Sequence, residues 1–411
     1  MKPAKIPISV LVVIHDGQGQ VLLIERADKP GFWQSVTGSL DQESEPPLQA
    51  AERELQEETG FVCPHEAWQD WQQTQRYEIF PHWRHRYAPG VTHNTEHVFS
   101  VRVSPGAQPV LSAREHLRHE WMTWQQAVER CFSWTNVLAI EQLAHRLGWS
   151  RLVAPELLTV ASYNIHKGRS SGFLGLRRRL VIHEMAQAVG SMAADLVFLQ
   201  EVQGRNDRAA LRQAHWPLEP QHDLLSNGYH QSAYRPAAHY LHGHHGNALL
   251  SQFPILTVQA QDFSDHALEK RSVLHAVVRY GSEALYLFVV HFGLLHQSRL
   301  RQFSHLVRWI EQAVPASAPL IVAGDFNDWR RQLPLTAFQA LGLEEISGRP
   351  VGRTGHRRPD RTFPSFMPIL PMDRMFARGF ELVASRRGGG GPRWASLSDH
   401  LPLLAQLRRR P

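Results

Sequence analysis

At 411 residues and 46.9 kDa, the chain is longer than one hydrophobic core usually supports, so two domains are expected. Its 43% hydrophobic content is that of a globular protein, and no apolar run approaches the length needed to cross a bilayer. The start of the chain continues as an alternating strand rather than a signal peptide, so we expect no membrane span and a cytoplasmic location. The two cysteines, Cys63 and Cys131, are too few for a disulfide framework or a zinc site, and reduced thiols are expected.

Charge is divided unevenly along the chain. Residues 1–148 hold 13 basic and 18 acidic side chains, whereas residues 149–411 hold 31 and 20, so the net charges are −5 and +11. The second half is therefore expected to prefer anionic substrates. Because arginine dominates, with five lysines in the whole chain, compositional bias contributes to this total, and the total alone does not indicate a nucleic-acid partner.

The first half is predicted to alternate strands and helices, beginning with a hairpin closed by the turn DGQG. Its predicted elements are strands at 8–14 and 21–26, a helix-sized stretch from Gly38 to Phe61, strands around 74–80 and 95–103, and helices at 124–132 and 135–147. A polar and aromatic loop rich in cationic groups separates the third strand from the fourth. The apolar periodicity lapses near a proline in 149–157, which is the predicted linker.

The helix-sized stretch carries a patterned acidic cluster. Glu54, Glu57 and Glu58 are three and four positions apart, so a helix would bring their carboxylates to one face. Like charges at this spacing destabilise an isolated helix, so a merely solvated helix leaves the cluster unexplained. A divalent cation explains it, because Mg²⁺ or Mn²⁺ takes hard oxygen ligands and bridges carboxylates to substrate phosphates. The cluster therefore predicts metal-assisted phosphoryl chemistry.

With Arg53 preceding these glutamates, the stretch resembles the Nudix box, G-x5-E-x7-R-E-U-x-E-E-x-G-U, where U is a bulky apolar residue. The match is complete over residues 45–61, whereas six residues rather than five separate Gly38 from Glu45. The resemblance implies an α/β/α sandwich with a mixed sheet, metal held by the three glutamates, and an orienting role for Arg53. It also implies attack by water at a phosphorus of a triphosphate, with Glu57 as a catalytic candidate besides its metal role.

Beyond the box, the first half resembles one Nudix subfamily, the dihydroneopterin triphosphate pyrophosphatases of bacterial folate synthesis. The resemblance covers nearly all of residues 7–145. It implies a pterin triphosphate as the substrate, with pyrophosphate and dihydroneopterin monophosphate as the products. The motifs that carry it are FWQSVTGSL (32–40), RHRYAPGVTHNTE (84–96), REH (114–116) and SWTNVLAIEQL (133–143).

These motifs contain candidate side chains for contacts to substrate and metal. Arg84, His85 and Arg86 could pair with phosphates that the metal leaves uncovered, because guanidinium groups fork onto phosphate oxygens. By resemblance Glu115 is a candidate fourth acidic ligand, and an exposed loop glutamate is the alternative. The aromatic side chains that could either stack on a flat pterin or pack in the core are Phe32, Trp33 and Trp83.

The second half contains apolar strands that end in polar residues. Functional groups gather where buried strands emerge from a sheet. One such residue would usually be structural, but five endings of carboxylate, amide and imidazole type predict a convergent metal site. The endings are Asn164 in 158–168, Glu201 in 195–201, His291 in 284–294, Asp325 and Asn327 in 318–328, and LSDH at 397–400.

This half resembles the endonuclease/exonuclease/phosphatase superfamily, the DNase-I-like metal-dependent phosphoesterases. The motifs occur in family order over essentially all of 158–407, and no key polar position is missing. The resemblance implies a four-layer α/β/β/α sandwich of two packed sheets flanked by helices. The matching motifs are NIHKG (164–168), LQEV (199–202), GHHGNALLSQFPI (243–255), VHFGL (290–294), GDFNDW (324–329), MDRMF (372–376) and SDH (398–400).

The superfamily resemblance implies a role for each polar ending. Glu201 and Asp399 are the implied ligands of Mg²⁺ or Mn²⁺, and Asn164 assists them. Asp325 and Asn327 are implied to position the nucleophilic water and the phosphate. These five residues would form the metal and nucleophile side of the site.

The remaining implied roles concern protons and developing charge. Asp373 would hydrogen-bond His400 and fix its tautomer, as in any base held by an orienting carboxylate. His291 and Asn247 would bind the charge that develops on the phosphoryl oxygens. The general base is left open between His400 and Asp325.

The sequence therefore predicts a bifunctional metal-dependent phosphohydrolase. Its predicted parts are a Nudix domain at 1–148, a linker at 149–157 and an endonuclease/exonuclease/phosphatase domain at 158–411. The second substrate is left open between a phosphatase, a nuclease and a phosphodiesterase substrate, with nucleic acid or a lipid head group as examples. One alternative is a generic nucleoside triphosphate pyrophosphatase fused to a nuclease or phospholipid phosphodiesterase. A non-enzymatic alternative, a nucleic-acid-binding second half, is disfavoured by the intact set of polar endings.

Overall fold

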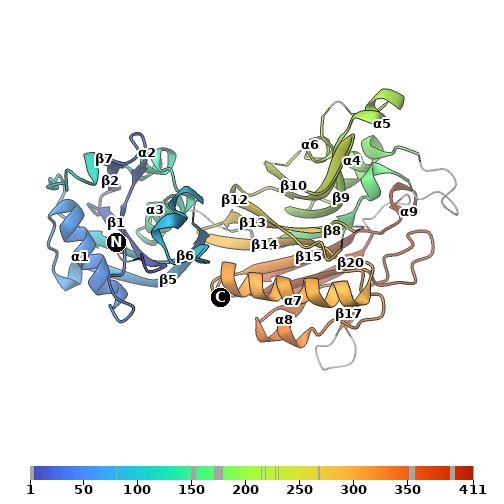
Figure 1. The fold of residues 1–411 in the computed structure, drawn as a ribbon. Helices are drawn as coiled ribbons and strands as arrows, with labels where there is room; N and C mark the ends of the chain where they lie inside the picture. The colour runs from blue at the N-terminus through green and yellow to red at the C-terminus, as the bar shows by residue number, and fades with distance from the viewer. Residues whose placement is uncertain are drawn as a thin grey trace. The chain divides into compact units, whose positions relative to one another are not determined.

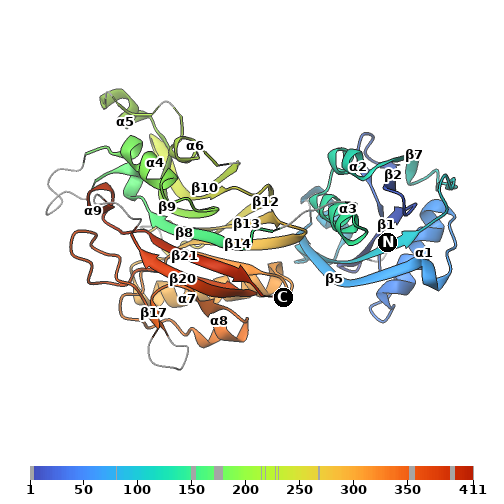
Figure 2. The same cartoon turned by 180° about the vertical axis from the view of Figure 1, so that it is seen from behind.

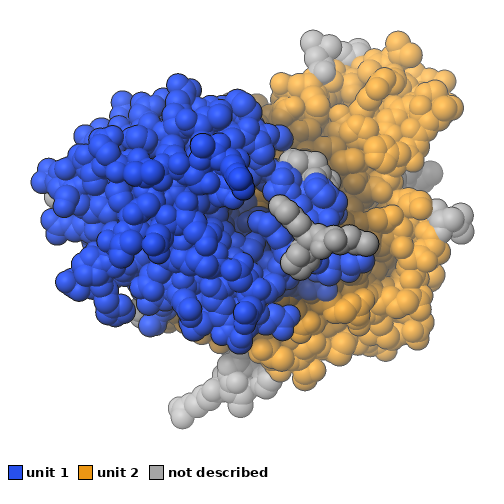
Figure 3. All heavy atoms as spheres, turned by 60° about the vertical axis from the view of Figure 1, so that its left-hand side comes forward, with its two compact units in different colours: residues 1–154, 281–283, 312–315 blue, residues 155–280, 284–311, 316–411 orange. Residues whose placement is uncertain are grey.

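Two compact units make up the computed structural model of the chain, and Figure 3 colours them separately. The first holds residues 1–154 with the short pieces 281–283 and 312–315, and the second holds the remainder. The predicted linker includes residues 150–153, which lie outside the described residues, so the predicted domain boundaries stay predictions. No helix in the described part of the chain has the length and apolar character needed to cross a bilayer. The structure describes residues 4–79, 81–149, 154–170, 179–213, 215–217, 219–226, 228–229, 231–266, 269–350, 357–388 and 394–410.

A seven-stranded mixed sheet forms the centre of the first unit (Figures 1 and 2). Its strand order is β3-β2-β1-β6-β5, with β4 also paired to β1 and β7 to β2, and β1 runs parallel to β6. The strands are β1 (Ile8–His15), β2 (Gln20–Arg26), β3 (Trp33–Gln34), β4 (Val36–Ser39), β5 (Trp68–Glu78), β6 (His93–Arg102) and β7 (His116–Thr123). The helices are α1 (Pro47–Thr59), α2 (Trp124–Arg130) and α3 (Trp134–Arg146), with 3-10 turns at His65–Ala67 and Pro81–Arg86.

Helices cover both faces of this sheet. Successive side chains of a strand point to opposite faces, so β1 supplies apolar groups to both sides. Val12 belongs to the same buried cluster as Leu55 of α1, whereas Leu11 belongs to the cluster that contains Ile140 of α3. The predicted α/β/α sandwich with a mixed sheet is confirmed.

The acidic helix is shorter than the stretch that predicted it. β1 and β2 form the predicted hairpin, with Ile14 opposite Leu22. Helix α1 begins only at Pro47, because the fixed φ of proline suits the first helical position, and Gly38 lies in β4 instead. The helix ends as predicted at Gly60, whose φ of 71° lies in the left-handed region that favours glycine.

Two six-stranded sheets form the centre of the second unit, in the orders β10-β11-β9-β8-β21-β20 and β12-β13-β14-β15-β19-β16. The first sheet consists of β8 (Leu158–Asn164), β9 (Leu196–Asn206), β10 (Gln231–Tyr240), β11 (Gly243–Ser251), β20 (Phe380–Arg387) and β21 (Leu403–Arg409). The second consists of β12 (Ile255–Asp262), β13 (Ser272–Tyr280), β14 (Glu283–His291), β15 (Leu320–Asp325), β16 (Glu344–Glu345) and β19 (Asp373–Arg378). The other elements are the 3-10 turn η3 (His166–Gly168), a small pair β17 (Arg349–Pro350) and β18 (Arg357–Arg358), and the helices α4 (Ile182–Gly190), α5 (Asp207–Arg212), α6 (Gln221–Leu225), α7 (His296–Ala313), α8 (Thr336–Ala340) and α9 (Trp394–Leu397).

The two sheets pack face to face between outer helices. Figures 1 and 2 show α4 and α6 on one side of the paired sheets and α7 and α8 on the other. Met185 of α4 shares a buried cluster with Tyr163 of β8, and Trp309 of α7 meets Phe288 of β14 edge to face. Between the helices, β15 of the second sheet lies against β8 and β9 of the first. The predicted four-layer sandwich is confirmed.

Candidate active sites

The acidic cluster of α1 runs from solvent into the interior of the first unit. The Glu57 side chain is 59% exposed, whereas those of Glu54 and Glu58 are 13% and 6% exposed. All three project from one face of the helix, as their spacing predicts. The cluster is therefore open to a ligand at one end and enclosed by protein at the other.

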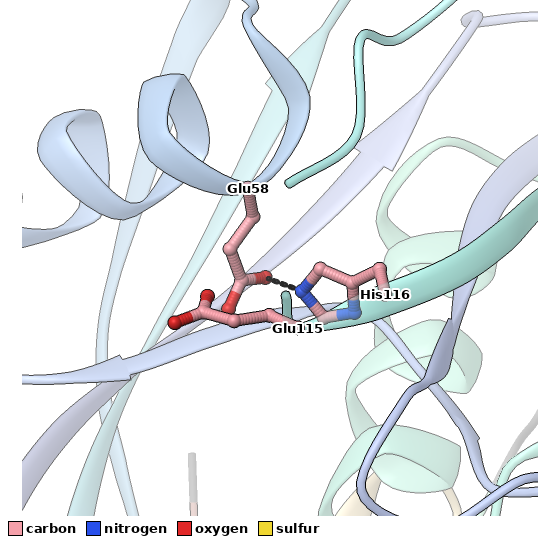
Figure 4. Close-up of side chains that lie close together, drawn as sticks. All are labelled: Glu58, Glu115 and His116. Atoms are coloured by element: carbon pink, nitrogen blue, oxygen red, sulfur yellow. Dashed lines mark ion pairs between the residues drawn. The ribbon is translucent and has the colours of Figure 1, made fainter. Parts of the chain in front are cut away.

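Glu58 points toward His116, the first residue of β7, and toward Glu115, which precedes it (Figure 4). One carboxylate oxygen of Glu58 lies 3.3 Å from Nε2 of His116. Ligand atoms of Glu58, Glu115 and His116 all lie within 4.8 Å of one another, so the structure brings Glu115 to the acidic helix. His116 is absent from the predicted site residues, although it ends the REH motif that carries Glu115.

Arg53 connects the glutamates of the box to the adjacent sheet. Its Nη1 donates to Glu54 at 2.8 Å and lies 3.6 Å from Glu57. Its Nε donates to Glu45 at 3.1 Å, and its Nη2 donates to the carbonyl of Ser39 at 3.1 Å. A planar fork of donors can hold several acceptors at once, so this geometry suits the orienting role predicted for Arg53.

Gly38 lies directly beneath the Glu54 side chain. A Cβ added to Gly38 would lie 1.8 Å from Cδ of Glu54. The requirement for glycine is therefore steric, because only a residue without a side chain lets this carboxylate pass over β4. The extra residue before Glu45 leaves this contact intact.

A divalent cation fits this cluster. Burial raises the pKa of Glu54 to about 7, despite a hydrogen bond from Arg53, and burial also raises the pKa of Glu58. Oε2 of Glu58 has Nε2 of His116 as an ion-pair partner at 3.3 Å, and the carboxylate lies within reach of Glu115, whose repulsion a cation would relieve. Hard oxygen ligands suit Mg²⁺ or Mn²⁺. Glu54, Glu57, Glu58 and Glu115 are the side chains that would hold it.

The predicted phosphate-binding arginines already have acidic partners. Arg84 forms an ion pair with Glu78 and donates to the carbonyl of Ile79 at 3.1 Å. Arg86 lies 3.4 Å from Asp28. Their side chains are 34% and 37% exposed, so a triphosphate could reach them but would compete with these carboxylates.

Only two of the three aromatic candidates are available for stacking. Trp33 is 3% exposed and belongs to the core cluster on the α3 face. Phe32 and Trp83 are half-buried and flank Phe132, at centroid distances of 4.7 and 6.4 Å. Arg26 lies over the Trp83 ring at 5.2 Å, so this aromatic group is also cationic.

In the second unit, a bulge in β9 presents Glu201. The register between β9 and β11 shifts at this point, so Gln200 and Glu201 together face the single residue Asn247. Glu201 has a φ of 56°, which turns its side chain out of the ladder. Asn247 is buried and donates from Nδ2 to the carbonyl of Ser272 at 2.7 Å, across to the second sheet.

Asp325 is the centre of the second candidate site and is 1% exposed. Asn164 donates from Nδ2 to its Oδ2 at 3.1 Å, and the backbone N–H of Asn327 donates to Oδ1 at 2.9 Å. The Nε2 atoms of His291 and His400 lie 3.7 and 3.8 Å from Oδ2. Burial raises the pKa of Asp325 to about 7, and burial lowers the pKa of His291. Four of the predicted residues thus meet around the carboxylate of a fifth, Asp325.

His400 lies between two buried carboxylates. Its Nδ1 is 2.7 Å from Oδ2 of Asp373, and Thr362 donates to the same oxygen at 2.5 Å. Burial lowers the pKa of His400, but the charges of Asp373 and Asp325 outweigh burial and raise it to about 10. The pair has the geometry of a proton-handling imidazole with an orienting carboxylate. No sequence pattern marks Thr362 as a site residue, because it lies in a loop outside the recognisable motifs.

The turn η3 places a lysine and a histidine beside the predicted metal ligands. Nζ of Lys167 lies 3.9 Å from Glu201, and Nδ1 of His166 lies 3.6 Å from Asp399. Burial raises the pKa of Glu201, but the nearby Lys167 and His166 outweigh burial and hold it below its ordinary value. Both residues belong to the NIHKG motif but are absent from the predicted site residues, so the motif alone did not reveal these contacts.

Backbone strain collects at this site. His166, Lys167, Glu201 and Asn327 have φ between 45° and 57°, which non-glycine residues adopt at a cost of about 1–3 kcal/mol each. Only seven non-glycine residues in the described ranges have positive φ, and these four carry site groups. Such strain persists where the surrounding structure requires it, so it favours a functional rather than a packing role.

A divalent cation also fits the second site. Glu201 and Asp399 are 22% and 29% exposed, so their oxygens are accessible to a ligand. Carboxylate and amide oxygens suit Mg²⁺ or Mn²⁺, with Asn164 as the amide. A bound cation would neutralise these carboxylates in addition to the charge of Lys167. Asp325, Asp373 and His400 also form a compact cluster, but their hydrogen bonds suit proton transfer better than metal binding.

Comparisons with known proteins divide the chain into the same two parts. A model of the endonuclease/exonuclease/phosphatase family matches residues 161–400, and a NUDIX domain model matches residues 5–142. Over 144 residues the chain is 45% identical to the dihydroneopterin triphosphate diphosphatase of Escherichia coli K12, covering 34% of this chain and 94% of that one. Over 251 residues it is 37% identical to an uncharacterized protein of the same strain, YbhP, covering 60% and 95%.

Among solved structures, the E. coli dihydroneopterin triphosphate pyrophosphohydrolase is 44% identical and covers 35% of this chain and 99% of its own, with a TM-score of 0.33. Both resemblances predicted from the motifs are confirmed by the family matches.

The contact between Gly38 and Glu54 can be tested by Gly38→Ala. The added methyl must displace the Glu54 carboxylate, and misplacing a catalytic group by about 1 Å costs on the order of 10²-fold in rate. We expect hydrolysis of a phosphoanhydride substrate by the first unit to fall by about that factor, measured with a coupled phosphate assay. Gly190→Ala is the control, because nothing lies within 4 Å of its Cβ position. Unchanged turnover by Gly38→Ala would contradict the steric assignment.

Proposed function

We propose, since this chain belongs to the endonuclease/exonuclease/phosphatase family and carries a NUDIX domain, that it is a bifunctional hydrolase with two separate metal-dependent sites. The first would release pyrophosphate from dihydroneopterin triphosphate. The relative that supports this substrate is the 45% identical dihydroneopterin triphosphate diphosphatase, and the buried acidic cluster of α1 supports the metal. Mg²⁺ and Mn²⁺ are the proposed cofactors at both sites.

In the first site, water would attack phosphorus and the anhydride bond between the first and second phosphates would break. The products are pyrophosphate and dihydroneopterin monophosphate. A bound metal supplies charge neutralisation and a more acidic water. Glu54, Glu57 and Glu58 would hold it, and Arg53 would keep two of these carboxylates in position through its contacts at 2.8 and 3.6 Å. Arg84 and Arg86 would bind the phosphates that the metal does not reach.

In the second site, His400 and Asp325 would handle the proton of the attacking water. Asp373 fixes the imidazole through its bond to Nδ1, which leaves Nε2 facing Asp325. The buried His291 and Asn247 would face the phosphoryl oxygens as charge develops on them. Glu201, Asp399 and Asn164 would hold the metal. The result is hydrolysis of a phosphoester by addition of water at phosphorus.

The remaining phosphate of the first product is the proposed substrate of the second site. Fusion of two domains raises the effective concentration of one site's product at the other, though modestly for flexible linkage. The chain would then convert the triphosphate to free dihydroneopterin. A generic nucleoside triphosphate pyrophosphatase is the alternative for the first site.

A lipid head group is the second candidate for the second site. Two loops next to the site expose apolar side chains: Leu294 and Leu295 follow His291, and Phe366 and Met367 lie between Thr362 and Asp373. Between 54% and 58% of each of these side chains is exposed. Binding of a small water-soluble substrate does not require exposed apolar side chains of this kind. Together with the +11 net charge of this half, they would suit a phosphodiester at an anionic lipid surface.

Separate sites predict separate losses of activity. Glu57→Gln should lower pyrophosphate release by about 10²-fold or more, because it removes a metal ligand worth several kcal/mol of transition-state stabilisation. Phosphoester hydrolysis by the second unit should stay near the wild-type rate. Glu52→Gln, an exposed glutamate on the same helix, is the matched control. Equal loss of both activities would show that the sites are not independent.

His400→Ala should disable the second site alone. A general acid or base typically contributes 10²–10⁴-fold, so phosphoester turnover should fall by about that factor while pyrophosphate release is retained. His183→Ala, an exposed histidine of α4, is the control for surface substitution. A loss below about threefold, on the same scale, would assign the proton to another residue.

Supplying dihydroneopterin monophosphate directly distinguishes the two candidate substrates of the second site. With Mg²⁺, the wild type should release inorganic phosphate and His400→Ala should not. A phospholipid or simple diester is tested beside it. The wild type could instead cleave a diester and leave the monophosphate intact. That result would contradict conversion of the triphosphate to free dihydroneopterin by the two sites in sequence, and it would favour a lipid head group or nucleic acid as the second substrate.

A further inference from the structure

A buried polar cluster lies on the α3 face of the first unit's sheet. Glu96 of β6 is 2% exposed and lies opposite Gln75 of β5 and beside Ser9 of β1. Asn94, two residues earlier on the same face, donates to Ser9 at 2.6 Å and to Tyr77 at 3.1 Å. Four polar side chains in the interior of a small sheet are not needed for packing.

The cluster does not satisfy its own hydrogen bonds. The described side chains leave Oε2 of Glu96, Oδ1 of Asn94 and both amide atoms of Gln75 without partners. Each buried polar group without a partner costs about 1–3 kcal/mol. Glu96 and Gln75 face each other across the strands yet do not pair. The cluster is therefore built to receive hydrogen bonds from something else.

Glu96 has one fixed partner, the side chain of Thr135 in the first turn of α3. Thr135 is 2% exposed, and its hydroxyl lies 2.7 Å from that of Ser133, so its position is fixed. Burial raises the pKa of Glu96 to about 7, with the Thr135 bond opposing the rise. Two N–H donors from a ligand would stabilise the carboxylate form that burial disfavours.

Strand β4 links this cluster to the catalytic groups. The backbone of Thr37 hydrogen-bonds Glu58, and the carbonyl of Ser39 accepts from Arg53. Ser39 lies opposite Ser9, the residue beside Glu96. Two residues of strand span roughly 7 Å, so the cluster lies on the order of 10 Å from the acidic helix. That is a suitable separation between a ring and the phosphates of one nucleotide-sized substrate.

An aromatic platform lies at the same end of α3. Phe132, three residues before Thr135, contacts Phe32 and is near Trp83. Lys29 lies over the Phe32 ring at 4.9 Å, and Arg86 lies over Trp83 at 5.8 Å. A flat heterocycle could stack here while cations meet its phosphates.

We propose that Glu96 is a specificity-determining residue that binds the 2-amino-4-oxopyrimidine edge of the substrate ring. That edge presents a ring N–H and an exocyclic amino group side by side, and a carboxylate accepts both in a bidentate pair. Thr135 holds the carboxylate, and Gln75 or Asn94 pairs with the adjacent ring atoms. This inference deepens the proposed function and rests on it for the identity of the ring as a pterin.

The test compares four triphosphates on the full-length chain. Dihydroneopterin triphosphate and GTP carry the two adjacent donors, inosine triphosphate lacks the amino group, and ATP lacks this edge. Glu96→Gln should lower kcat/KM by about 10- to 100-fold for the first two, the range for a lost hydrogen bond to a charged group. For ATP the change should be under about threefold, and for inosine triphosphate, which keeps the ring N–H, the loss should lie between those for ATP and GTP. The loss should appear chiefly in KM, because Glu96 lies away from the reacting phosphorus.

Thr135→Val is the second variant, since it removes the hydroxyl but keeps the side-chain volume. It should reproduce the same substrate ranking with a smaller loss. Thermal unfolding is measured for each variant. An equal loss on all four triphosphates, or no loss on dihydroneopterin triphosphate when the wild type hydrolyses it, would overturn the assignment of Glu96.

If dihydroneopterin triphosphate is not the substrate of the first site, the same experiment gives a different result. A wild type that ignores dihydroneopterin triphosphate but hydrolyses GTP in a Glu96-dependent way would remove the pterin and leave the recognition of this edge standing. Binding of dihydroneopterin without phosphates, followed by fluorescence, adds a readout independent of the metal site. Wild type should bind it at least about tenfold more tightly than Glu96→Gln. Equal binding would contradict the inference.

Discussion

One hydrogen bond, from the amide of Asn164 to the carboxylate of Asp325, joins the ends of the two sheets of the second unit. Asn164 ends β8 in the first sheet, and Asp325 ends β15 in the second. Because β9 runs parallel to β8 and β14 runs parallel to β15, Glu201 and His291 emerge at the same edge. The whole site therefore depends on the packing of one sheet against the other.

The first unit is subject to a different constraint. Three of its candidate metal-binding carboxylates come from one helix rather than from several strands. Neighbouring glutamates on a helix repel one another, so they need a counter-charge and a fixed position. Arg53 supplies part of the charge, and the bare backbone of Gly38 gives Glu54 its place. A glycine and an arginine thus set the geometry, although neither would perform the reaction.

Motifs predicted the fold and most of the candidate site, because strand ends and helix faces convert sequence spacing into position. They failed where position depends on tertiary contacts. Strand β7 was not predicted, since only His116 and Met122 of its side chains are buried and no alternation marks it. Thr362, Lys167 and His166 reach their partners through loop and turn conformations that residue type does not reveal. Glu96 was missed because a lone glutamate in a strand looks like a surface residue until its burial is known.

The net charge of each half does not describe where its basic side chains gather. The first half is acidic overall, yet Arg26, Lys29 and Arg86 gather around Phe32 and Trp83 at distances between 4.9 and 5.8 Å. In the second half, Lys167 and His166 of η3 lie 3.9 and 3.6 Å from carboxylates. Coulomb energies fall with distance and are screened over about 10 Å, so nearby groups outweigh the total. The electrostatic environment of each candidate site is therefore determined by the side chains next to it rather than by the net charge of its half.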